Sequence, residues 1–193
     1  EHYHVEIDGE ARKNVEKSRS LVEDILHRNE TVYGINTGFG ELSKVRIEGK
    51  DLSQLQTNLI MSHACGMGNP FPKNIVRGIM LLRVNALIKG FSGIRLSTID
   101  TLLEMLNKDV VPYIPEQGSV GSSGDLAPLS HMVLVMLGMG KAYYKNELLD
   151  GNEAMEKAGI PSITLVAKEG LALINGTQVM TSVLGVTLIE AFK

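Results

Sequence analysis

Residues 118–131 read GSVGSSGDLAPLSH, and an apolar segment follows from Met132 to Met139. Glycines at this density relax the limits on the backbone dihedral φ, so the chain can turn tightly here. The apolar segment cannot face water, and it is expected to form a buried helix with the loop at its N-terminal end. A tight turn held above the start of a buried helix is typical of a site of chemistry.

Three common glycine-rich loops do not fit this stretch. No lysine follows any of its glycines, which excludes a phosphate-binding loop. The glycines at 118, 121 and 124 are spaced by three, which excludes the dinucleotide pattern GxGxxG. Neither Ser122 nor Ser123 has glycines two positions before and after it, which excludes the hydrolase elbow GxSxG. A loop containing Ser122-Ser123-Gly124 remains, for which a helix-capping connector is the plain alternative.

The stretch closely resembles the signature of the aromatic amino-acid ammonia-lyases. In that family an Ala-Ser-Gly triplet cyclises to the prosthetic group methylideneimidazolone. The resemblance implies that the Gly124 amide nitrogen attacks the Ser122 carbonyl, and that Ser123 loses its hydroxyl as water to leave an electrophilic methylene. This chain has Ser122 where the family usually has Ala; a serine still permits ring closure, but its hydroxymethyl group would lie beside the electrophile. The chain would thus make its own cofactor, with no metal.

Composition limits the other classes of function. The chain has 193 residues, 44% hydrophobic and 21% charged, with a net charge of -3. This is typical of one soluble domain, taken as residues 1–193. The charge gives no reason to expect a nucleic acid or membrane partner, and the apolar runs are too short to span a bilayer. We expect no signal peptide, and one cysteine, Cys65, suits a reducing cytoplasm. Cys65 and nearby His63 are too few ligands for a metal site.

Hydrophobic periodicity predicts mainly helices. Capping residues, glycines and prolines set their limits, and a short hairpin turning at Lys145-Asn146 is expected to lie on the surface. The expected elements are helices at 8–29, 52–61, 70–89, 96–108, 151–158 and 179–193, an extended segment at 110–115 and the hairpin at 141–149.

A second glycine-rich loop, residues 33–40, reads YGINTGFG. Alone it would be a turn with Tyr33 and Phe39 as hydrophobic anchors. It matches a family motif over all eight residues, and the resemblance implies that Tyr33 takes part in the elimination. A phenol in a polarised site can carry a proton.

The pair Ser62-His63 follows a helix. A histidine there is commonly a C-terminal cap. The pair also resembles the substrate-selecting pair of those family members that act on histidine. An imidazole substrate needs a partner that can donate or accept a hydrogen bond, and His63 can do either.

Residues 168–178 form the last motif, which contains Asn175-Gly176. Asn-Gly usually marks a turn. The resemblance implies that Asn175 hydrogen-bonds the prosthetic group or the substrate carboxylate, as a neutral donor can.

These observations predict the N-terminal part of the ammonia-lyase fold: mainly α, with glycine-rich active-site loops and a small surface β-hairpin, and without the C-terminal long-helix bundle. The resemblance implies a homotetramer that converts L-histidine to trans-urocanate and ammonia, and a 193-residue piece that is inactive alone. A lyase or aminomutase for another aromatic amino acid, and a non-catalytic relative, remain alternatives.

Overall fold

The structure is a computed structural model that describes residues 3–121 and 124–193; Ser122 and Ser123 lie outside the described residues. The chain is 54% helical with few strands, which confirms the mainly α fold class. The helices, in chain order, are α1 (Gly9–His27), the 3-10 turn η1 (Gly40–Leu42), α2 (Gly49–His63), α3 (Lys73–Leu87), α4 (Leu96–Asn107), α5 (Leu126–Met136), α6 (Gly151–Lys157), α7 (Glu169–Ile174) and α8 (Gln178–Ala191).

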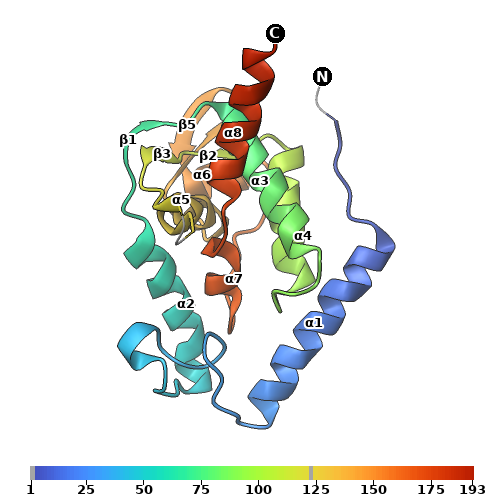
Figure 1. The fold of residues 1–193 in the computed structure, drawn as a ribbon, viewed down its shortest axis with the longest axis vertical. Coiled ribbons are helices and arrows are strands. Elements are labelled where there is room, and N and C mark those ends of the chain that lie inside the picture. Colours follow the sequence, from blue (N-terminus) through green and yellow to red (C-terminus); the bar gives the residue numbers. More distant parts are fainter. Residues whose placement is uncertain (1–2, 122–123) are drawn as a thin grey trace.

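The first helix begins and ends where the sequence predicts. The Asp8 carboxylate accepts a hydrogen bond from the Glu10 amide at 2.8 Å, which satisfies one of the free N–H groups at the helix start. Asn29, just beyond the helix, has φ 57°, a left-handed conformation that ends it. Figure 1 shows α1 and α2 on opposite sides of the lower half of the molecule, joined by a loop beneath it.

The second helix is longer than the predicted 52–61, because it begins at Gly49 and continues through Ser62 and His63. The Nδ1 atom of His63 lies 2.9 Å from the Leu59 carbonyl. A side chain that bonds a carbonyl of the last turn extends a helix beyond its apolar pattern.

The apolar segment after the serine loop forms α5, and it lies in the core. Met132, Val133, Val135 and Met136 are each 0% exposed, and α5 contacts α2, α6 and α7. The predicted burial of this segment is confirmed, although its helix begins earlier, at Leu126, and ends at Met136. The loop that precedes α5 is thus attached to a rigid, fully packed helix.

Two small antiparallel sheets complete the fold. In the first, β1 (Met67–Pro70) pairs with β3 (Pro115–Gln117). In the second, β2 (Val111–Pro112), β4 (Lys141–Tyr144) and β5 (Glu147–Asp150) lie in the order β2-β4-β5. The predicted hairpin turn is confirmed, but the hairpin is not isolated, because β2 adds a third strand. Residues far apart in sequence supply that strand, so local patterns do not reveal it.

The last two helices are separated by a break that contains Asn175. By length and composition alone, Glu169–Ala191 could cross a membrane. The break divides this segment into helices of 6 and 14 residues, and a 14-residue helix rises only about 21 Å, less than the roughly 30 Å of a bilayer core. In the structure α8 packs on α3 instead, where the Ser182 hydroxyl donates to the Ile75 carbonyl at 2.7 Å.

Candidate active site

The described part of the serine loop meets the α7–α8 junction at Gly124. Its φ of 95° lies in the left-handed region, which favours glycine. A side-chain carbon placed on Gly124 would lie 3.3 Å from the Gly176 carbonyl oxygen and 3.4 Å from Asn175 Oδ1. The next residue, Asp125, donates its amide to the Gly176 carbonyl at 2.7 Å. Two segments that the sequence indicated separately, 118–131 and 168–178, therefore meet in space.

The Asp125 carboxylate joins the serine loop to the start of α8 by hydrogen bonds. It is 0% exposed, and its Oδ2 accepts the amides of Val179 at 2.8 Å and Met180 at 3.1 Å. These amides belong to the first turn of α8, whose N–H groups lack helical partners. The helix dipole also favours a negative charge at that end. The Ser119 hydroxyl donates to the other oxygen, Oδ1, so the loop and the helix share one buried anion.

The 62–68 segment lies against the other side of the serine loop. A carbon placed on Gly118 would lie 3.2 Å from the Cα of Gly66, and Gly66 donates its amide to His131 Nε2 at 3.0 Å. Because Nε2 accepts this bond, His131 must be unprotonated there. Burial lowers the pKa of His131 below its ordinary value, which favours the same neutral form.

The hydrogen bonds of His63 define its tautomer. A carbonyl oxygen can only accept, so the 2.9 Å contact with Leu59 places the ring proton on Nδ1. The Ser62 hydroxyl lies 3.1 Å from the same nitrogen. Within the described residues Nε2 makes no hydrogen bond, which leaves an acceptor free. His63 is therefore a C-terminal cap of α2, the ordinary role of a histidine at this position, and its Nε2 is available for a ligand.

The Tyr33 loop approaches α7 through Gly34. Tyr33 is 58% exposed and packs edge to face on Phe39, with ring centroids 6.2 Å apart. A carbon on Gly34 would lie 3.0 Å from the Leu171 side chain, one turn before Asn175 on α7. Among the described residues Tyr33 makes no hydrogen bond to the other motifs.

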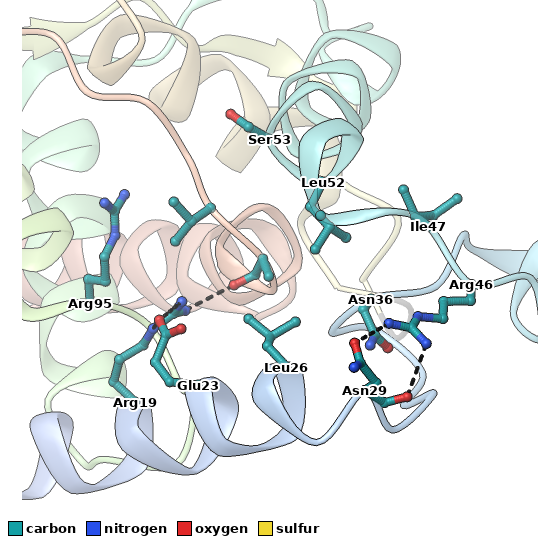
Figure 2. A pocket seen from close by; sticks show the side chains of 13 residues that line it. Arg19, Glu23, Leu26, Asn29, Asn36, Arg46, Ile47, Leu52, Ser53 and Arg95 are labelled. Carbon is teal, nitrogen blue, oxygen red and sulfur yellow. Dashed lines mark hydrogen bonds and ion pairs between the residues drawn. The ribbon is translucent and has the colours of Figure 1, made fainter.

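A cavity of about 450 Å³ opens between α1, α2 and the connecting loop (Figure 2). Two of its arginines, Arg19 and Arg46, bond within the wall of the cavity, whereas a third, Arg95, forms its ion pair with Glu169 outside that wall. Arg19 donates to Glu23 and, at 3.0 Å, to the Ala167 carbonyl, and Arg46 donates to the backbone and side chain of Asn29. None of the described candidates, Tyr33, His63, Gly124 and Asn175, lines this cavity, so it is separate from the junction at Gly124.

Metal ligation has no support in the described ranges. Across residues 3–121 and 124–193, no group of three or more His, Cys, Asp or Glu side chains could hold a metal ion. Cys65 is exposed and has a free thiol.

Two buried charged residues at the junction were not among the sequence candidates. Asp125 directly follows Gly124 and precedes the buried helix, a position that suggested only a cap. Arg83 lies within the apolar pattern of α3, and its guanidinium donates to the Asn175 carbonyl at 3.2 Å. A charged residue within an apolar helix indicates a buried polar contact, but the sequence does not show which residues make that contact.

The fold and the meeting of these loops can now be compared with known proteins. The chain belongs to the aromatic amino acid lyase family, whose family model matches residues 1–193. It is 59% identical over 188 residues to a histidine ammonia-lyase of Streptococcus sanguinis, covering 97% of this chain and 37% of that protein.

Solved structures agree with this assignment. Histidine ammonia-lyase from Trypanosoma cruzi matches with a TM-score of 0.87 and 44% identity, over 94% of this chain and 35% of that one. Pantoea agglomerans phenylalanine aminomutase matches with a TM-score of 0.90 and 40% identity, over 98% of this chain and 36% of that one. The chain therefore spans little more than a third of the length of these relatives, and it corresponds to the N-terminal part of their fold.

Proposed function

We propose that the complete protein carrying this chain is a histidine ammonia-lyase, which converts L-histidine to trans-urocanate and ammonia. The observation that carries the proposal is the meeting of the 62–68, 118–131 and 168–178 segments around Gly118 and Gly124. The 59% identity to a relative named histidine ammonia-lyase supports the choice of substrate.

The prosthetic group in this proposal is methylideneimidazolone, made from Ser122, Ser123 and Gly124. The surroundings of Gly124 fit it: its φ of 95° favours glycine, its amide donates to the Gly121 carbonyl at 2.9 Å within a tight turn, and Asn175 Oδ1 and the Gly176 carbonyl oxygen lie where a side-chain carbon would be. A larger residue would fill this space. Once formed, the group would supply an electrophilic methylene for the elimination.

The chain's own residues bind and orient the substrate. His63 Nε2 accepts a hydrogen bond from the substrate imidazole, because Nδ1 is already committed to Leu59. The exposed Asn175 amide hydrogen-bonds the substrate carboxylate or the prosthetic group. The Tyr33 hydroxyl carries the proton in the elimination. Holding the weakly acidic β-hydrogen close to a base is where orientation contributes most to the rate.

The same proposal includes the assembly and the compartment. Residues 1–193 form a single domain, supported by one hydrophobic cluster that extends from Ile7 to Val179. The complete protein is a homotetramer, which the exposed apolar side chains of α8 support. An exposed free thiol at Cys65 suits a reducing cytoplasm.

The decisive test is the mass and activity of the complete protein. We expect it to be lighter by two water molecules than its encoded chain and to release ammonia and urocanate from L-histidine. Ser123→Ala has no hydroxyl to lose as water, so it should fail to make the methylene and lose nearly all turnover. Ser122→Ala is the matched control, and it should remain active because it restores the usual triplet. Full activity in Ser123→Ala, or an encoded mass in the wild type, would overturn the proposal.

A second candidate is a lyase or aminomutase for another aromatic amino acid. The similarity to phenylalanine aminomutase, with a TM-score of 0.90, favours testing it. The products formed from L-histidine, L-phenylalanine and L-tyrosine separate the two: an aminomutase returns a β-amino acid, whereas a lyase returns free ammonia. A complete protein whose Ser122-Ser123-Gly124 triplet stays intact and uncyclised would be a non-catalytic relative.

A further inference from the structure

Arg83 is a buried cation without a carboxylate partner. Its residue is 4% exposed, it forms no ion pair with any described carboxylate, and its Nε atom has no hydrogen-bond partner. Burial lowers the pKa of the Arg83 guanidinium to about 10, so the group is still charged at neutral pH. An unpaired charge in a protein interior is costly, and a structure retains one where its remaining contacts offset that cost.

The remaining contacts of Arg83 all go to the α7–α8 junction. Its Nη2 donates to the Ala172 carbonyl, and its Nη1 donates to the Asn175 carbonyl at 3.2 Å and to Gln178 Oε1 at 2.7 Å. Ala172 and Asn175 carry free carbonyls at the C-terminal end of α7, where a cation is favourable. Gln178 begins α8. One guanidinium therefore joins the end of one helix to the start of the next.

Gly176, between α7 and α8, also lies close to the Arg83 guanidinium. A side-chain carbon on Gly176 would overlap Arg83 Nη1, so the guanidinium occupies the space that a side chain would need. The opposite side of the junction faces the serine loop, through the 2.7 Å bond from the Asp125 amide to the Gly176 carbonyl. Asn175 Oδ1 lies on that side as well, near Gly124. The junction is thus held between Arg83 and the residues that follow the triplet.

We propose that Arg83 is a positioning residue for the elimination, and that its guanidinium holds the α7–α8 junction so that the Asn175 amide stays directed at Gly124. The inference rests on the proposed function and assigns Arg83 no contact with substrate. Its planar fork of donors can reach carbonyls in two directions at once, whereas a lysine ammonium is a single point of charge. A displacement of about 1 Å at a substrate-orienting group can reduce a rate by roughly a hundredfold.

A small cavity makes this proposal accessible to chemical rescue. Arg83, Leu171 and Asn175 line a space of about 180 Å³ that reaches the surface. Truncation of Arg83 to alanine would enlarge it enough to admit a guanidinium ion. The ion could then restore the donors without restoring the covalent link to α3.

Arg19 offers a matched control. It is also buried, at 8% exposed, and it also donates to two carbonyls, those of Gly93 and Ala167 at 3.1 and 3.0 Å. Neither carbonyl belongs to the break between α7 and α8, and Arg19, which also pairs with Glu23, lines the separate cavity of Figure 2. Arg19→Ala should therefore lower stability in a comparable way without moving Asn175.

The experiment compares the wild type, Arg83→Ala, Arg83→Lys and Arg19→Ala as complete proteins, by intact mass, Tm and the kinetics of histidine elimination. We expect Arg83→Ala to keep the mass loss of two waters while its kcat falls roughly ten- to hundredfold. Millimolar guanidinium, far below denaturing concentrations, should restore part of that kcat. Arg83→Lys should keep the fold and show a smaller loss, and Arg19→Ala should keep kcat within about twofold of the wild type.

Each contrary outcome has a defined meaning. A wild type that does not eliminate ammonia from any aromatic amino acid refutes the proposed function, and this inference with it. An active wild type whose Arg83→Ala variant loses no more kcat than Arg19→Ala, or does not respond to guanidinium, refutes the inference alone. A variant that stays at its encoded mass would make Arg83 a residue for ring formation or folding, which also overturns the assignment. If Arg83→Ala does not fold, full kcat in Arg83→Lys would count against the proposal.

Discussion

Asp125 accepts a hydrogen bond from the Val179 amide at 2.8 Å, across 54 positions of sequence. This bond joins the residue that follows the serine loop to the first turn of α8. Because Asp125 is fully buried and its other oxygen accepts from Ser119, the loop cannot move relative to the helix without leaving polar groups unpaired.

We predict that Asp125→Ala lowers the free energy of unfolding by about 2–3 kcal/mol, from the loss of a helix cap and the unpaired groups left behind. Asp8→Ala is the control, because Asp8 caps α1 by one bond at an exposed position and should cost only about 1 kcal/mol. Denaturant unfolding of both variants measures the difference. Equal losses would show that the Asp125 bonds add nothing beyond an ordinary cap.

His63 is predicted to select the substrate ring. His63→Leu leaves a bound imidazole without its hydrogen-bond partner, which typically costs about 1–3 kcal/mol, or roughly ten- to hundredfold in kcat/KM. The loss should fall on histidine and spare phenylalanine, whose ring needs no partner. Ser62→Ala is the control, because it perturbs the same helix end but leaves His63 Nε2 intact. If the ratio of kcat/KM for the two substrates does not change in His63→Leu, the residue is only a cap.

His131 is predicted to make stability depend on pH in the mildly acidic range. Burial places its folded-state pKa below the ordinary value of 6.5, so the unfolded chain binds more protons just below pH 6.5. Stability should therefore fall as the pH is lowered through that window, as protonation of Nε2 also removes the bond from Gly66. In His131→Gln, which keeps a neutral acceptor, Tm should fall less between pH 7 and 5. An NMR titration midpoint of His131 at or above 6.5 would contradict this.

The exposed face of α8 is predicted to drive self-association of residues 1–193 when they are expressed alone. Leu184, Leu188 and Phe192 are 69%, 53% and 84% exposed, and neighbouring apolar side chains at a surface favour association. Val179, in the first turn of the same helix, is buried and takes no part. Leu184→Glu with Leu188→Glu should shift light scattering toward the monomer, whereas Leu21→Glu, at an exposed position of α1, should not. A monomeric wild-type piece would refute the prediction, and so would histidine turnover by it.

Local patterns were sufficient for most of the helices, but they did not predict α7, and the helix expected at 70–89 begins at Lys73, after the strand β1. Asp8 and Asn29 set the limits of α1 because capping depends on neighbouring residues in the chain. The buried position of α5 followed from its uninterrupted apolar composition. The third strand beside the hairpin could not be foreseen, because the pairing of β2 with β4 joins residues about 30 positions apart through backbone bonds that carry no side-chain signature.

The sequence by itself determined the family, since the glycine-rich loops around Tyr33 and Gly124 and the Ser62-His63 pair are contiguous motifs whose residue types follow from local backbone and chemical needs. Only the tertiary structure decided which atoms meet: Asn175 beside Gly124, Asp125 on the first turn of α8, and Arg83 beneath the α7–α8 junction. The physical reason is that buried charges and polar groups are stabilised only by partners that packing brings to them. Those partners come from distant helices, so no stretch of sequence names them.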